Sequence, residues 1–190
     1  MKKSSPHSTD EARIVLGIDP GTLVTGYGVV ARRGTVLRLL ACGTITNRAE
    51  IPMPLRLQRI FRDLQTLVRT HAPDEVAIES AFYGKNVQSA LKLGHARGVS
   101  LLAAVEENLP TAEYSPREVK QAVVGKGNAT KEQVRFMVRA ILDAPTGAMP
   151  LDASDALAVA ICHCQRSTPA RKTRGDWKAF IEAHPERVHA

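Results

Sequence analysis

Four acidic residues stand where a compact α/β protein can present carboxylates to a substrate. Asp19 ends an apolar run that begins at Arg13, and Pro20-Gly21 then turns the chain away from it. Glu79 ends a second apolar run, Val76-Ala77-Ile78, where a charge is costly to bury without a partner. If the two runs are neighbouring strands, these carboxylates converge at one edge of a sheet. An isolated Asp-Pro-Gly also serves simply to brace a turn.

Asp152 and Asp155 are spaced so that they share one face of a helix. Small residues at Ala153, Ala156 and Ala160 would let that helix approach a sheet closely. Acids in a first helical turn also stabilise the helix dipole by ~0.3–1 kcal/mol, which explains this pair equally well on its own. The combination of two strand-end acids and a spaced helical pair is more informative than either part.

Together the four acids form an all-oxygen donor set of the kind that Mg²⁺ prefers. Unit charges ~4 Å apart repel by about 4 kcal/mol at an effective dielectric of 20, so several such pairs need compensation. Two divalent ions ~3.5–4 Å apart supply it, and they can activate a water and stabilise the leaving oxygen of a phosphodiester. The cluster therefore predicts a metal-dependent nuclease that uses two Mg²⁺ ions, with Mn²⁺ as a substitute.

Composition narrows the class of partner. The chain has 26 Lys and Arg against 19 Asp and Glu, a net charge of +7, which favours nucleic acid as partner, although a basic surface also serves solubility alone. Three cysteines are too few for a disulfide framework and predict a reducing, cytoplasmic location. Cys162-His163-Cys164 lacks a second Cys or His pair at zinc-site spacing. No apolar stretch resembles a signal peptide or a membrane span, so no membrane partner is expected.

Hydrophobic periodicity predicts one α/β domain over residues 13–165, between a flexible N-terminal tail (1–12) and a basic, flexible C-terminal tail (166–190). Expected strands cover 13–19, 26–32, 35–46, 75–79 and 111–114, the first three as an antiparallel meander. Expected helices run from 54 to before 73, over 86–109, from 116 onward, from a capping box at 130–133 to about 142, and over 152–165. This order predicts a five-stranded mixed sheet with helices on both faces.

Several stretches carry a family likeness: Gly17-Ile18-Asp19-Pro20-Gly21 with Thr25-Gly26-Tyr27-Gly28-Val29, Ala77-Ile78-Glu79, Ala90-Leu91-Lys92-Leu93-Gly94 with Ala96-Arg97-Gly98-Val99, Val119-Lys120-Gln121-Ala122-Val123-Val124-Gly125, and Asp152-Ala153-Ser154-Asp155-Ala156-Leu157-Ala158. In this order, over about residues 13 to 165, they resemble the RuvC family of bacterial Holliday junction resolvases, or crossover junction endodeoxyribonucleases. The resemblance covers most of the chain.

The resemblance implies an RNase H-like fold and a homodimer that resolves four-way DNA junctions by paired symmetric nicks in recombination and repair. The products would carry 5′-phosphate and 3′-hydroxyl ends. By motif match, Asp19, Glu79, Asp152 and Asp155 would be both catalytic and metal-binding. The partners implied are the branch-migration proteins RuvA and RuvB.

Candidate DNA contacts lie in two regions. Phe82, Tyr83 and Lys85 follow closely after Glu79, and by resemblance Phe82 would wedge against bases at the crossover; a core role is the alternative, and Tyr83 stays open. The second region contains Arg117, Lys120, Lys126 and Lys131, which could bind phosphates. For Arg117 and Lys126 a solvated surface role is equally compatible. Lys131 begins a helix, where a cation opposes the dipole, and that misfit favours a functional role.

The alanine-rich helix 86–109, with Gly94 and Gly98, could pack against a second copy of itself, although ordinary packing on the sheet is the alternative. Two other functions compete with the nuclease. An ATP-binding phosphotransferase module shares a motif like Gly17–Thr22, but such proteins need two domains around a nucleotide. A non-catalytic junction-binding adaptor would explain the basic charge, but it would not need four acids.

Overall fold

The computed structural model describes residues 12–80, 87–144 and 149–166. Its five strands form one mixed sheet in the order β3-β2-β1-β4-β5. The strands are β1 (Arg13–Asp19), β2 (Val24–Arg33), β3 (Val36–Thr46), β4 (Glu75–Glu79) and β5 (Thr111–Tyr114). β1, β2 and β3 are antiparallel neighbours, whereas β4 runs parallel to β1 and β5 runs parallel to β4. The predicted meander and mixed sheet are confirmed.

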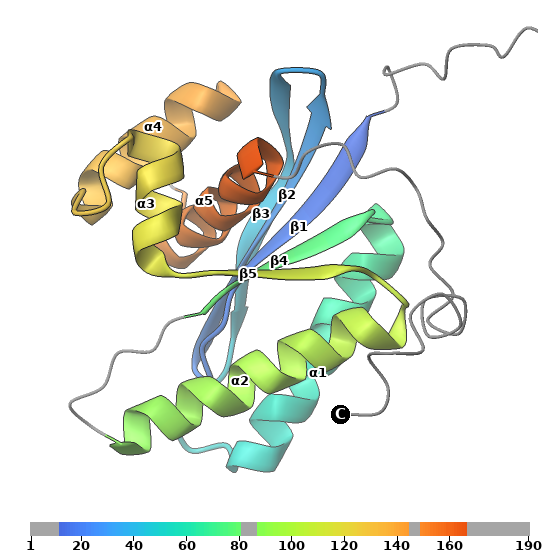
Figure 1. Ribbon diagram of the computed structural model, residues 1–190. Helices are drawn as coiled ribbons and strands as arrows, with labels where there is room; N and C mark the ends of the chain where they lie inside the picture. The colour runs from blue at the N-terminus through green and yellow to red at the C-terminus, as the bar shows by residue number, and fades with distance from the viewer. Residues whose placement is uncertain (1–11, 81–86, 145–148, 167–190) are drawn as a thin grey trace, which may run out of the picture.

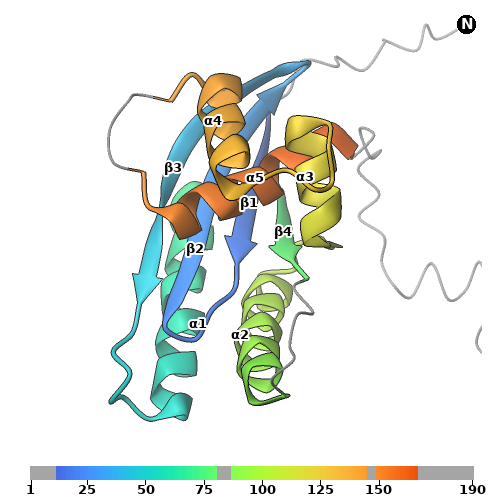
Figure 2. The ribbon, with the colours of Figure 1, turned by 90° about the vertical axis from the view of Figure 1, so that its left-hand side faces the viewer.

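Five helices accompany the sheet in the described parts of the chain: α1 (Met53–His71), α2 (Val87–Glu106), α3 (Pro116–Val124), α4 (Lys131–Leu142) and α5 (Leu151–Arg166). α1 and α2 cover one face, whereas α3, α4 and α5 cover the other (Figures 1 and 2). Alternate residues of the strands feed two separate cores, so that Val15 and Ala77 pack towards α5 and Leu16 and Ile78 pack towards α1. The predicted helices on both faces are confirmed.

Local signals in the sequence explain where the helices begin and end. Ser115 and Glu118 form a capping box at the start of α3, and Thr130 and Gln133 form the predicted one at the start of α4. Gly125 ends α3 in the left-handed conformation that glycine adopts without strain. No helix within the described residues is long and apolar enough to cross a membrane. The two predicted tails fall almost entirely outside the described residues.

Helix α5 is the most deeply buried element, because its small side chains bring its backbone against the sheet. At two sheet positions the backbone carbonyl groups of α5 leave no room even for a methyl group. A Cβ atom added to Gly17 would lie 2.2 Å from the carbonyl oxygen of Ala156, and one added to Gly26 would lie 1.9 Å from that of Asp152. Since Gly26 pairs with Asp19 in the sheet, this contact brings the start of α5 to the end of β1.

The contact at Gly17 predicts that Gly17→Ala destabilises the protein by about 1–3 kcal/mol, as overpacking of a tight core does. The atom nearest to the new methyl group belongs to the backbone of Ala156, and the side chain of Ala160 is only a secondary neighbour. Adding Ala160→Gly should therefore fail to restore stability. Urea denaturation of both variants measures this, and an unchanged midpoint for Gly17→Ala would contradict the close contact.

Candidate active site

Asp19 and Glu79 stand at the carboxyl ends of two neighbouring parallel strands. The pairing of β1 with β4 ends at Ile18 and Ile78, so both acids come one residue beyond the last pair. Side chains alternate along a strand, and Gly17 and Ala77 face α5. Asp19 and Glu79 therefore project on the α5 side of the sheet, and their carboxyl groups hydrogen-bond to each other. A hydrogen bond between two carboxyl groups requires one of them to hold a proton.

The pKa values of this pair indicate crowded negative charge. Burial and, after it, repulsion from the neighbouring Asp19 carboxylate raise the pKa of Glu79 to about 8. Burial also raises the pKa of Asp19 to about 6, against the lowering effect of the hydrogen bond from Glu79, with Asp155 and Asp152 adding repulsion. The site therefore holds more acidic groups than its own cations neutralise.

The first turns of α5 carry the other two acids to the same place. Asp155 accepts a hydrogen bond from the ammonium group of Lys131, with Nζ 2.9 Å from Oδ2, and this bond raises the pKa of Lys131. Lys131 is the first residue of α4, so the cation that opposes the dipole of its own helix is held by an acid of another. The structure thus places Lys131, predicted as a DNA contact, within the acidic cluster.

The four acids form a donor set made only of carboxylate oxygens. Within the described residues, no three His, Cys, Asp or Glu side chains surround one point as ligands of an ion do. Asp155 instead forms an ion pair with Lys131. The chemistry of the residues nevertheless fits a hard divalent cation, since all four acids supply oxygen and their negative charge lacks compensation. His163 is engaged elsewhere, with its ring nitrogens bonded to Tyr114 and Glu75.

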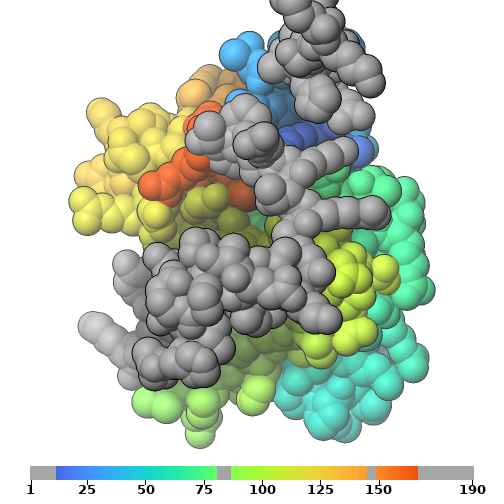
Figure 3. All heavy atoms as spheres, turned by 45° about the vertical axis from the view of Figure 1, so that its right-hand side comes forward, coloured from blue at the N-terminus to red at the C-terminus, as the bar shows by residue number. Residues whose placement is uncertain are grey.

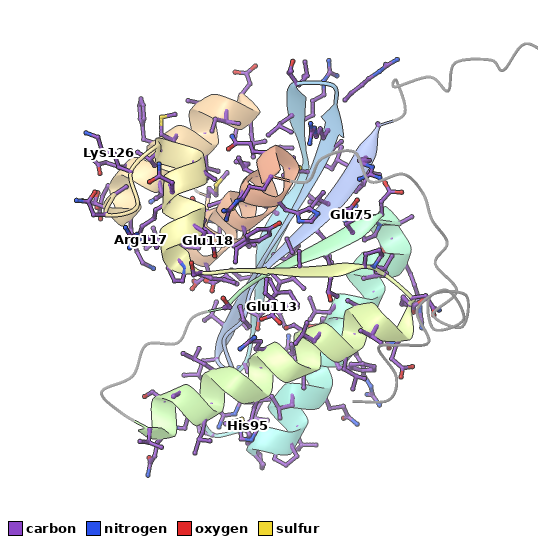
Figure 4. The ribbon with its side chains drawn as sticks, viewed as in Figure 1. Glu75, His95, Glu113, Arg117, Glu118 and Lys126 are labelled. Atoms are coloured by element: carbon purple, nitrogen blue, oxygen red, sulfur yellow. The ribbon has the colours of Figure 1, made fainter. Side chains whose placement is uncertain are left out.

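The remaining predicted site residues lie farther out or outside the described chain. Phe82, Tyr83 and Lys85 lie outside the described residues. Lys120 is half-buried on α3. Arg117 and Lys126 are exposed on the outer side of α3 and in the loop that follows it (Figure 4). The side chain of Arg117 lies against Gly127 of that loop, where an added Cβ would be 2.8 Å from Arg117 Cγ.

Sequence reasoning missed two residues that build the site without carrying its chemistry. Gly26 admits the backbone of Asp152, and a glycine inside a strand was the signal for such a close approach. Thr25 is fully buried, and its hydroxyl donates to the carbonyl oxygen of Gly21 over 2.6 Å. This bond stabilises the turn directly after Asp19. A buried threonine in a strand carries no local signal of that role.

The chain is similar to proteins of known activity. A family model described as "Crossover junction endodeoxyribonuclease RuvC" matches residues 15–163. The protein of that name from Cytophaga hutchinsonii is 44% identical over 188 residues, covering 99% of this chain and 93% of the relative. The one from Pelobacter propionicus is 52% identical over 149 residues, covering 78% and 84%.

Solved structures agree with these relatives. The Thermus thermophilus RuvC in complex with Holliday junction substrate superposes with a TM-score of 0.75 at 38% identity, covering 80% of this chain and 92% of that one. The yeast mitochondrial Holliday junction resolvase has a TM-score of 0.60 at 14% identity, covering 95% and 87%, and shares the fold.

The raised pKa of Glu79 predicts a pH-dependent stability for the metal-free protein. A carboxyl group whose pKa is higher in the folded than in the unfolded state contributes stability at low pH and loses it as the pH rises through the folded value. We expect stability in EDTA to decline as the pH rises from about 5 to about 8. Glu79→Gln cannot ionise, so its decline should be smaller.

Urea denaturation in EDTA at about pH 5.5 and pH 8.5 measures the effect, with the exposed Glu106→Gln as the matched control. If Glu79→Gln and Glu106→Gln lose equal stability between these pH values, the charge crowding at Glu79 is disproved.

Proposed function

This chain belongs to the RuvC family of crossover junction endodeoxyribonucleases, and we propose that its acidic cluster at the ends of β1 and β4 and the start of α5 is where the junction is cut. The protein is accordingly an endonuclease of Holliday junctions that acts in DNA recombination and repair. The observation that carries the proposal is that Asp19 and Glu79 end the paired strands β1 and β4 at the place where α5 brings Asp152 and Asp155, the latter in an ion pair with Lys131.

In the proposed mechanism Asp19, Glu79, Asp152 and Asp155 hold two Mg²⁺ ions, for which Mn²⁺ substitutes. When bound, such a pair activates a water and stabilises the leaving 3′ oxygen of the phosphodiester, leaving 5′-phosphate and 3′-hydroxyl ends. Glu79 must give up its proton to become a full ligand, and its raised pKa makes that loss depend on the arrival of positive charge. Lys131 holds Asp155 in place and adds a cation near the path of the phosphate.

DNA is proposed to lie across the acidic edge of the sheet, between α2 and α3, where β4 ends (Figure 1). Lys120, Lys126 and Arg117 of the α3 region would bind its phosphates, which positions the duplex without reading sequence. Phe82, Tyr83 and Lys85 are proposed to contact the crossover, because they follow Glu79 directly in the chain and aromatic rings stack on unpaired bases.

A homodimer is proposed from the exposed face of α2. Its outer residues form a continuous apolar stripe at helical spacing: Val87, Leu91, Gly94, Gly98, Leu102 and Val105. The four large ones are 50–72% exposed, and open space lies beyond both glycines. The opposite face of α2, with Ala96 and Ser100, is already buried, so the sheet and α1 do not use the stripe. A second copy would cover it, and two-fold symmetry suits a junction that is cut twice.

Figure 3 shows α3 in yellow and α2 in yellow-green at separate places on the surface. We propose that DNA and a second subunit bind at the same time. The family resemblance also suggests RuvA and RuvB as protein partners, and we include them in the proposal.

Asp19→Asn is expected to reduce cleavage at least ~10³-fold while junction affinity changes little, because one ligand of the cations is lost. The test uses end-labelled four-way junction, linear duplex and single-stranded DNA with Mg²⁺, Mn²⁺ or EDTA, together with a binding assay. Asp63→Asn is the matched control, since Asp63 is a partly exposed acid on α1 that pairs with Arg59. Undiminished nicking by Asp19→Asn would reject the assignment, and tight binding without any cutting by the wild type would favour the adaptor.

Leu91→Glu is expected to shift the protein towards monomer, because it places a charge in the middle of the proposed apolar interface. Sedimentation velocity at micromolar concentration measures this with and without junction DNA. Leu40→Glu is the matched control, since Leu40 is 47% exposed on β3, away from α2. A wild type that sediments only as monomer in both conditions would rule out the dimer.

A further inference from the structure

Asn47 is a buried polar residue at the same edge of the sheet as the acidic cluster. It follows β3 directly, and only 6% of it is exposed. Its backbone N–H donates to the carbonyl oxygen of Leu23 over 2.7 Å. Its side-chain amide Nδ2 faces two more carbonyl oxygens, those of Thr22 at 3.3 Å and of Arg56 at 3.4 Å. Asn47 therefore joins the turn between β1 and β2 to the first turns of α1.

The turn that Asn47 contacts is the one that leaves the Asp19 carboxylate. Residues 20–23 connect β1 to β2, and three successive carbonyl oxygens of the turn are bonded. Thr25 donates to Gly21, and Asn47 donates to both Thr22 and Leu23. Thr25 of β2 and Asn47 after β3 thus both hold this turn through hydrogen bonds to its carbonyl oxygens.

Asp19 needs this support because the sheet holds it on only one side. It pairs with Gly26 of β2, but the pairing of β1 with β4 ends one residue earlier, at Ile18. Asp19 also carries the repulsion of Asp152 and Asp155, which would push its carboxylate away from the cluster. The contacts of the turn therefore decide where the Asp19 carboxylate stands relative to Glu79.

The side chain of Asn47 acts as a hydrogen-bond donor in these contacts. A primary amide has two N–H donors on one nitrogen, which matches two facing carbonyl oxygens. The other amide atom, Oδ1, has no hydrogen-bond partner among the described residues, so the acceptor is not what the site uses. An aspartate of the same shape would place a carboxylate against two carbonyl oxygens and would lose both bonds.

We propose that Asn47 is a positioning residue for junction cleavage, which holds the turn after Asp19 against α1 and thereby sets the placement of the Asp19 carboxylate for metal binding. The inference rests on the proposed role of Asp19 in the active site. It assigns no contact between Asn47 and DNA or metal.

The test compares Asn47→Asp and Asn47→Ala with the wild type, below the Tm of each variant. Both should bind metal-free junction with a Kd within ~2-fold of wild type. In saturating Mg²⁺ the single-turnover rate on pre-bound junction should fall ~10–100-fold, as expected for a displacement on the order of 1 Å, with Asp more severe than Ala. The rise in Tm on adding Mg²⁺ should also shrink in both variants. Asn108→Asp makes the same change at an exposed turn between α2 and β5, away from the acids, and should behave like wild type.

Wild-type values for both the rate on bound junction and the Mg²⁺-induced rise in Tm would overturn the proposal. So would a loss confined to junction affinity, which would make Asn47 a DNA contact, or failure of both variants to fold, which would make it purely structural. Asp19→Asn, measured in parallel, separates failure of the proposed active site from failure of the positioning role of Asn47. If it cuts normally, the proposed active site is wrong, whereas if it is inactive and Asn47→Asp is normal, only the positioning role is wrong.

Discussion

The backbone contact between α5 and the central strands is the constraint on which the rest of the structure depends. Glycines at positions 17 and 26 let the carbonyl groups of Ala156 and Asp152 approach distances that no larger residue allows. One consequence is a core in which the inner face of α5 is almost fully buried. The other is chemical, because the same contact brings Asp152 and Asp155 to the strand ends that carry Asp19 and Glu79. The same contact between α5 and the sheet therefore both packs the core and brings the four acids together.

Bringing the four acids together has an unfavourable electrostatic consequence. Burial raises the pKa of both Asp19 and Glu79, and repulsion from neighbouring carboxylates adds to it, so that the folded chain retains a proton that the unfolded chain would release. Lys131 offsets part of the charge, but it approaches from a helix start where a cation is otherwise unfavourable. Because the negative charge of the site is only partly neutralised, the folded protein is less stable without bound cations than with them. Such a loss of stability is common at functional sites.

The helices on the two faces of the sheet have different tasks in the proposed enzyme. α4 and α5 carry Lys131, Asp152 and Asp155 to the strand ends, and capping boxes fix where α3 and α4 begin. α1 and α2 cover the other face, where α2 leaves an apolar stripe exposed and α1 receives the contact from Asn47. The proposed reaction centre lies at the carboxyl ends of β1 and β4, on the α5 side of the sheet.

The sequence by itself determined the elements and the positions of the four acids along them. A charge that follows an apolar run is less costly at the end of a strand than in its buried middle, and this places Asp19 and Glu79 at strand ends whatever the topology. Capping chemistry likewise marks the start of α4 at Thr130 and Gln133, because those bonds span only three residues. Only the tertiary structure decided that β4 lies beside β1, that Lys131 pairs with Asp155 across 24 residues, and that Asn47 reaches the turn of Thr22 across 25. Such contacts depend on strand order and helix docking, for which local periodicity carries no signal.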